Sequence, residues 1–114
     1  MKNDFGGHDN WHFNNTYAYA GMALSVTDTL HSHEDHFYSN RVVLTASDVG
    51  NPMCSAPKTV MAENQYFTPD GKLTECKTSL EKNQEKKHMD LGSTVAKHPD
   101  DATIIGWAKA TLGF

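Results

Sequence analysis

Histidines are the side chains in this sequence whose spacing most directly predicts chemistry. The chain has seven of them, and the segment from residue 31 to residue 36, His-Ser-His-Glu-Asp-His, holds three beside two carboxylates. Imidazole nitrogens and carboxylate oxygens are common zinc ligands, and alternate residues where a strand runs into a loop can converge on one ion. The candidate metal ligands are His31, His33, Asp35 and His36, and His88 and His98 lie far enough downstream to add to them.

The same string resembles the HxHxDH signature of the metallo-β-lactamase superfamily. The resemblance implies a small metal-dependent hydrolase or metal-binding protein that uses His31, His33 and His36. The surroundings depart from the family's pattern, because Phe37-Tyr38-Ser39 stands where glycines are expected and 114 residues are too few for its four-layer fold. We therefore keep this function as the alternative.

The two cysteines, Cys54 and Cys76, match no closely spaced metal-binding or redox motif. The N-terminus lacks the apolar stretch of a signal peptide, which favours a cytoplasmic chain with reduced cysteines. The alternative is a disulfide that closes the loop between them and stabilises the fold by about 3 kcal/mol. No stretch approaches the ~20 apolar residues of a membrane span, and no nucleophile or phosphate-binding motif is present. We expect no membrane partner, no cofactor and no catalytic residue.

A mildly basic segment between residues 72 and 98 predicts a contact with nucleic acid. If residues 72–88 form a strand, their basic and hydroxyl side chains lie on one face and their glutamates on the other. Lysines and hydroxyls suit phosphate contacts. The candidate RNA-binding residues are Lys72, Thr74, Thr78, Lys82 and Lys86. The good helix formers between residues 79 and 88 leave a helix open for residues 79–91.

The elements that would position these residues are mainly strands. Residues 11–26 alternate in polarity around Asn14-Asn15, which predicts an N-terminal hairpin. Thr68-Pro69-Asp70-Gly71 predicts the turn of a second hairpin, from residues 58–67 into 72–80. We find no internal repeat and no linker. The chain is predicted to be a single domain, 1–114, with a loose arm over 1–10, a mainly β region over 11–98 and a C-terminal helix over 99–114.

The C-terminal helix is predicted to dock on a second subunit. Pro99-Asp100-Asp101 suits a helix start, because proline fits the first turn and carboxylates favour the positive end of the helix dipole. Leu, Ile, Val and Phe number only 20 of 114 residues, so the chain's own core is thin. Apolar side chains wrap more than one side of the helix. The candidate dimer and assembly residues are Ile104, Ile105, Trp107 and Leu112.

This layout of polar start, aromatic hairpin, strands and apolar terminal helix resembles the coat proteins of single-stranded RNA bacteriophages. The most specific stretch runs from Leu91 to Thr103 and is similar to the strand, His-Pro and helix that end some of those proteins. The resemblance implies an α+β fold, in which an antiparallel β-sheet with an N-terminal hairpin receives the C-terminal helix of a partner subunit.

In function, the resemblance implies a structural capsid protein and not an enzyme. Such a protein forms a homodimer, assembles into an icosahedral shell and binds single-stranded RNA on a sheet face. It is found in the virion, which is assembled in the host cytoplasm. A small interaction protein that dimerises without chemistry would share the predicted fold but not the RNA-binding face.

Overall fold

Strands dominate the computed structural model, which describes residues 1–3, 7–55 and 57–113. Most of them belong to three parallel sheets. One sheet holds β1 (Lys2–Asn3), β4 (Leu24–Val26) and β7 (Gly50–Asn51). The next holds β2 (Trp11–Phe13), β5 (His36–Tyr38) and β8 (Val60–Ala62). The last holds β3 (Thr16–Ala20), β6 (Arg41–Leu44), β9 (Gln65–Thr68) and β12 (Thr94–Lys97).

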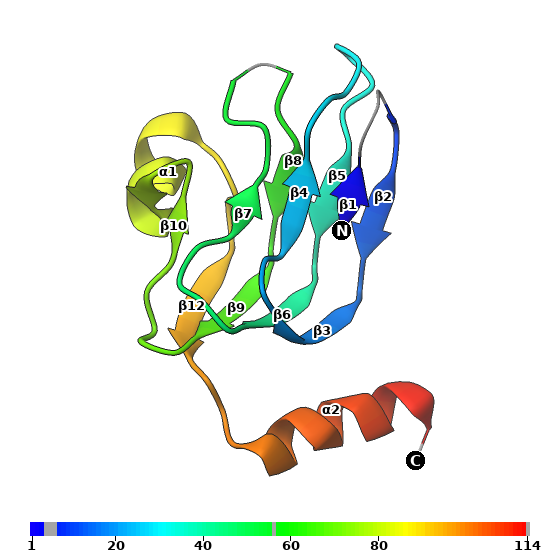
Figure 1. Cartoon of the computed structure of the whole chain (residues 1–114), viewed down its shortest axis with the longest axis vertical. Helices are drawn as coiled ribbons and strands as arrows, with labels where there is room; N and C mark the ends of the chain where they lie inside the picture. Colours follow the sequence, from blue (N-terminus) through cyan, green and yellow to red (C-terminus); the bar gives the residue numbers. More distant parts are fainter. Residues whose placement is uncertain (4–6, 56, 114) are drawn as a thin grey trace.

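Neighbouring strands in each sheet come from successive passes of the chain, so the chain winds in coils (Figure 1). Trp11 pairs with His36 and His36 with Val60, which makes one pass 25 residues long and the next 24. This architecture is a parallel β-solenoid of about four turns. Because each coil packs against the coils on either side of it, the core is a column that runs along the solenoid.

Side chains in register form this column. Tyr17, Val42, Tyr66 and Val95 occupy one position in four consecutive coils. Val42 and Tyr66 are buried, and Tyr17 and Val95 pack against the buried cluster at its margin. Residues two apart on a strand point to the same side, so the alternating sequence separates the inside of each coil from its outside.

An asparagine ladder, formed by Asn15, Asn40 and Asn64, occupies the corner between the second and third sheets. The Oδ1 of Asn40 accepts a hydrogen bond from the backbone N–H of Asn15, and the Oδ1 of Asn64 accepts one from the N–H of Asn40, both at 3.0 Å. The side-chain amides of Asn40 and Asn64 donate to the carbonyls of His12 and Phe37. These amides supply the partners that the backbone loses where it turns the corner.

The residue before each ladder position has a left-handed backbone. The φ angles are 56° at Asn14, 53° at Ser39 and 55° at Glu63. In the fourth coil Gly92 takes this place with a φ of 75°, and the Ser93 hydroxyl accepts the last backbone N–H of the ladder. The same turn is therefore built four times, with an outward residue before each ladder position. The ladder side chain is buried in the three later turns, at Asn40, Asn64 and Ser93, and exposed in the first, at Asn15.

A short hairpin and a helix cover the C-terminal end of the solenoid. β10 (Thr74–Glu75) pairs antiparallel with β11 (Thr78–Ser79), and α1 (Leu80–Lys87) follows directly. The Ser79 hydroxyl accepts the N–H of Lys82 and caps the helix. A disulfide joins Cys54 to Cys76 and ties this hairpin to the preceding coil. The expectation of reduced cysteines is wrong, and the disulfide alternative is confirmed.

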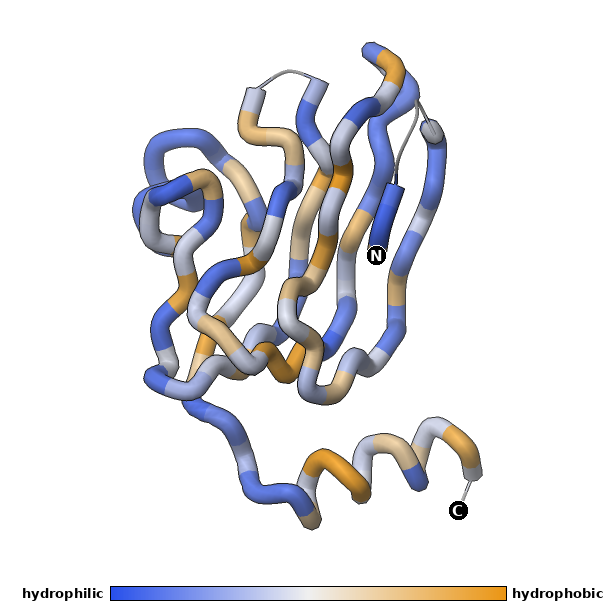
Figure 2. Tube along the Cα trace, in the orientation of Figure 1, coloured by the Kyte–Doolittle hydropathy of each residue, from blue (hydrophilic) through white to orange (hydrophobic). Residues whose placement is uncertain are grey.

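The C-terminal helix forms where the sequence predicts it but packs on its own subunit. α2 (Asp101–Leu112) lies outside the coils along β3, and it is rich in apolar residues (Figures 1 and 2). Asp100 accepts the N–H of Thr103 at 2.8 Å and caps the helix. Ile104 is buried, and the Trp107 ring packs on Phe67 of β9. The outer face of the third sheet is thus partly covered from within the chain.

The predicted antiparallel α+β fold and the resemblance to RNA-phage coat proteins are wrong, because the main sheets are parallel and belong to a solenoid. Neither predicted hairpin forms. The segments on either side of Asn14-Asn15 turn a corner and pair with the next coil, and β9 does not pair with β10. Residues 80–87 are a helix and not a strand. Alternation determines which side chains face inward, but a hairpin and a coil share that alternation.

Two expectations from the sequence are also corrected: the absence of an internal repeat and the loose arm at the N-terminus. The structure repeats itself every coil, although the sequence shows no obvious repeat. Residues Lys2 and Asn3, placed in a loose arm from the sequence, pair with β4 as β1, and the N-terminal ammonium donates to the carbonyl of Ala23.

Candidate functional site

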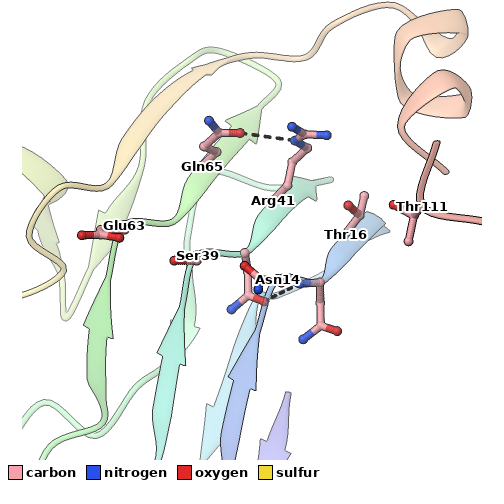
Figure 3. Close-up of a pocket in the computed structure, with 9 residues that line it drawn as sticks. Asn14, Thr16, Ser39, Arg41, Glu63, Gln65 and Thr111 are labelled. Carbon is pink, nitrogen blue, oxygen red and sulfur yellow. Dashed lines mark hydrogen bonds between the residues drawn. The ribbon is translucent and has the colours of Figure 1, made fainter.

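A polar cavity of about 390 Å³ opens on the outer side of the asparagine-ladder corner (Figure 3). Thr16, Arg41 and Gln65 line it from the first positions of three neighbouring strands, and Asn14, Ser39 and Glu63 line it from the turns before them. Thr111 reaches it from the end of α2. The repeating coil therefore places three copies of the same pair of outward positions side by side.

Arg41 is the fixed cation of this cavity. Its Nε donates to the Oε1 of Gln65 at 3.2 Å, and its guanidinium carbon lies 4.2 Å from the centre of the Trp107 ring. A guanidinium on an aromatic face is held by cation–π attraction. The N–H groups that Arg41 does not use for these contacts make it the main ionic donor to a ligand in the cavity.

Next to the cavity, four rings form an aromatic ladder on the outer face of the second sheet: Trp11, Phe13, His36 and Tyr38. Trp11 stacks on His36 with centroids 3.9 Å apart, and Phe13 stacks on Tyr38 at 5.1 Å. Trp11 remains 56% exposed and Phe13 46% exposed. Exposed rings of this size that adjoin one another mark a binding surface more often than a packing detail.

The aromatic ladder leads directly into the cavity. Phe13 is followed by Asn14 and Tyr38 by Ser39, so the last rings of the sheet adjoin the first polar residues of the turn. Between the two outward rings of β2, His12 points toward the interior. Burial lowers the pKa of its imidazole, and the N-terminal ammonium lowers it further, so His12 adds no positive charge at neutral pH.

The charge of this combined surface is close to neutral. One arginine and one glutamate, Arg41 and Glu63, stand among amides and hydroxyls in the cavity lining. Amides and hydroxyls both donate and accept hydrogen bonds, whereas a phosphate-binding surface concentrates donors and positive charge. The arrangement suits a ligand that has many hydroxyl groups and an apolar face.

A second, more apolar cavity of about 500 Å³ lies between α2 and β3. Three of the predicted assembly residues, Ile104, Ile105 and Leu112, line it. Ile104 is buried, whereas Ile105 is 53% and Leu112 is 71% exposed. The fourth, Trp107, packs against Arg41 and Phe67 in the same chain. The structure thus divides these residues between an internal contact and an exposed helix side.

The predicted metal ligands do not converge. The His31 side chain is exposed and lies 3.8 Å from Glu34, while His36 stacks on Trp11. Asp35 is fully buried, and its Oδ1 accepts the backbone and side-chain N–H groups of Asn10. His33 turns to a different partner, Asp9, which comes from the preceding coil. Successive residues along a coil point to opposite sides, into the core or out to solvent. The side chains of the linear motif therefore do not meet in space.

The predicted RNA-binding residues are spread over several elements. Lys72 lies in the loop before β10, and Thr74 and Thr78 lie on the paired strands β10 and β11. Lys82 and Lys86 are exposed on α1. Residues 72–88 therefore have no common sheet face on which these side chains could align.

No protein-family model matches this chain, and neither does any curated protein or solved structure. None of the helices in the described residues is long and apolar enough to cross a membrane.

Neither the cavity nor the aromatic ladder is predicted as a site from the sequence, although the sequence contains one signal for them. Asn15, Asn40 and Asn64 are spaced by 25 and 24 residues, and each stands between an outward residue and the start of a strand. Aligned on these asparagines, the strands before and after them have the same in–out pattern. That spacing is the repeat of the solenoid.

Proposed function

We propose that this protein binds a neutral carbohydrate chain along the aromatic ladder and the adjoining polar cavity. The observation that carries the proposal is the continuity of the two features: exposed rings at Trp11 and Phe13 run into a cavity lined by amides and hydroxyls. A sugar ring has the matching chemistry, because its C–H face is apolar and its rim carries hydroxyl groups.

Each part of the surface has a role in this proposal. The exposed ring surfaces of Trp11 and Phe13 remove the apolar face of a sugar from water, which favours binding. The Gln65 amide and the Thr16 hydroxyl bind sugar hydroxyls, and the Arg41 guanidinium donates hydrogen bonds to ring or hydroxyl oxygens. The regular spacing of the coils presents equivalent groups to successive units of a chain.

Charge favours a neutral ligand over a polyanion. The protein has a formal net charge of −4, and Arg41 is the one cationic side chain in the cavity lining. Non-specific nucleic-acid affinity depends on several phosphate contacts at once. Shell assembly and RNA packaging stay predictions from the sequence, but the fold on which they were based is replaced by the solenoid.

Binding, not cleavage, is the proposed activity. Glycosidases of most families use a pair of carboxyl groups, one on each side of the scissile bond. The cavity lining contains a single carboxylate, Glu63. The disulfide Cys54–Cys76 adds a proposal about location, because disulfides persist in oxidising compartments and at cell surfaces, where polysaccharides are found.

Affinity electrophoresis followed by calorimetry tests the proposal. The probes are a soluble β-glucan, a xylan and a galactomannan as neutral chains, with polygalacturonate and polyuridine as polyanions. We expect at least one neutral polysaccharide to bind, and we expect Trp11→Ala to weaken that binding tenfold or more. Met22→Ala is the matched control, since Met22 is 53% exposed but lies outside this surface.

Fluorescence separates the two tryptophans of the chain, Trp11 and Trp107. Most of the response to the bound polysaccharide should survive in Trp107→Phe and be lost in Trp11→Phe, because Trp11 would contact the ligand directly and Trp107 only through Arg41. Exclusive binding of polyuridine or polygalacturonate would overturn the proposal. So would an unchanged affinity in Trp11→Ala, or the absence of binding to every neutral chain.

A further inference from the structure

A second cluster of chemically capable side chains lies at the opposite end of β2 from the polar cavity: His8, Asp9 and His33. The Nδ1 of His8 lies 2.9 Å from the Oδ2 of Asp9, and the Nδ1 of His33 lies 2.8 Å from the same oxygen. Their ligand atoms all lie within 4.8 Å of one another. The two imidazole rings meet edge to face, with centroids 5.7 Å apart.

The register of the solenoid explains why these histidines meet. Trp11 pairs with His36, so the positions three residues earlier, His8 and His33, are equivalent in adjacent coils. The backbone N–H of Asp9 donates to the carbonyl of His33 at 2.9 Å and fixes the two coils to each other at this point. The pair is therefore set by the backbone and not by the chance positions of two flexible side chains.

We propose that His8, Asp9 and His33 bind one zinc ion. Two imidazole nitrogens and one carboxylate oxygen form a donor set that zinc commonly takes, with water in the remaining position. Each pair of ligands around a tetrahedral zinc is separated by a little over 3 Å, given metal–ligand distances of about 2.0–2.1 Å. The two histidine–aspartate separations of 2.8 and 2.9 Å are near this value, and all the ligand atoms lie within 4.8 Å of one another, so side-chain rotations can bring them to it.

The charge and exposure of the cluster suit a dissociable ion. The Asp9 carboxylate is the one acidic group of the cluster, and its Oδ2 lies within hydrogen-bond distance of both imidazole rings. The three side chains are 46%, 48% and 57% exposed in chain order, which leaves a path from solvent. In the zinc-bound state each ring would ligate through Nδ1 and carry its proton on Nε2.

This site differs from the linear histidine motif. His33 belongs to both, but Asp35 is buried in hydrogen bonds to Asn10, and His36 stacks on Trp11. His31 lies beside Glu34 and not beside Asp9. The distinction is testable, because His31→Ala should leave the proposed site intact and His8→Ala should destroy it.

Calorimetric titration of the full chain, free of any histidine tag, with zinc chloride tests the proposal. We expect one ion per chain and at least a tenfold loss of affinity in each of His8→Ala, His33→Ala and Asp9→Asn. Zinc should also shift the imidazole NMR signals of His8 and His33 while those of His88 stay in place. His31→Ala and His88→Ala serve as matched controls that keep wild-type affinity.

Circular dichroism and thermal unfolding of each variant without metal separate loss of the site from loss of the fold. Asp9→Asn preserves shape, so a folded Asp9→Asn protein with reduced zinc affinity supports the assignment even if a histidine variant is unstable. Unchanged affinity in His8→Ala would overturn it. Equal losses in His31→Ala and His8→Ala, or weak binding of several ions without saturation, would do the same.

Discussion

Two buried polar side chains, Asn64 at the corner and Glu75 under the C-terminal cap, behave in opposite ways. Both are completely inaccessible to solvent. Asn64 accepts the N–H of Asn40 and donates to the carbonyl of Phe37 and to Asp90. Neither carboxyl oxygen of Glu75 has a hydrogen-bond partner within the described part of the chain. Burial of a polar group stabilises a fold only where partners are built around it.

The protonation state of Glu75 follows from its burial without hydrogen-bond partners among the described residues. Burial raises the pKa of Glu75 to about 10, and the neighbouring carboxylate of Asp90 contributes in the same direction. Glu75 therefore keeps its proton in the folded protein at neutral pH. Asp90 has its own partners, since it accepts hydrogen bonds from Tyr66 and Ser93 as well as from Asn64. The cap thus contains one carboxyl group with partners and one without.

Replacement of Asn64 should have the largest effect. In Asn64→Ala the N–H of Asn40 and the carbonyl of Phe37 lose their partners, and each unsatisfied buried group costs about 1–3 kcal/mol. We expect the free energy of unfolding to fall by about 4 kcal/mol, measured by urea denaturation. Asn14→Ala is the control, because Asn14 precedes the ladder and is exposed. Equal effects of the two variants would remove the distinction between ladder and outer residue.

Glu75→Gln should have a smaller effect of opposite sign. Glutamine has a similar shape but does not ionise, so folding no longer requires the uptake of a proton at neutral pH. We expect a gain of about 3 kcal/mol in the free energy of unfolding at pH 7. A loss of stability in Glu75→Gln would show that the buried carboxyl group stabilises the fold, as Asn64 does, and would remove the contrast between the two positions.

The pH dependence of the free energy of unfolding provides the sharper test of the raised pKa of Glu75. Its folded pKa lies above the ordinary value of 4.5, so its contribution to stability is complete below pH 4.5 and is lost as the pH rises toward about 10. The wild-type protein should therefore lose stability across this window relative to Glu75→Gln. Thermal unfolding at intervals of one pH unit measures the difference between the two curves. Parallel curves would contradict the assignment.

The smallest effect is expected on the outer side of the corner, at Glu63. Its φ of 55° lies in the left-handed region, which costs a residue with a side chain about 1–2 kcal/mol and glycine very little. Glu63→Gly should raise the free energy of unfolding by about 0.5–1 kcal/mol, because the flexibility of glycine in the unfolded chain offsets part of the gain. Gln65→Gly, in the neighbouring strand β9, should lower it. A loss of stability in Glu63→Gly would contradict this reading of the turn.

The candidate site was predictable from the sequence only in its components. The alternation of residues 11–26 was recognised, but the stacking of Trp11 and Phe13 on His36 and Tyr38 depends on a partner strand 25 residues away. The histidine motif was recognised as a source of metal ligands, yet the coil separates its members and pairs His33 with Asp9 instead. Contacts between coils join residues that no local pattern connects.

Local chemistry in the sequence determined the start of the C-terminal helix at Pro99-Asp100-Asp101, the turns at Asn14-Asn15 and at residues 68–71, and the alternation of side chains along the strands. These features depend on a few neighbouring residues and on backbone sterics. The partner of each strand, the destination of α2 and the two side-chain clusters were decided by the tertiary structure alone. The reason is that an alternating strand satisfies a hairpin and a solenoid equally, and the choice between them is made by the asparagine ladder and the column of apolar side chains acting across coils.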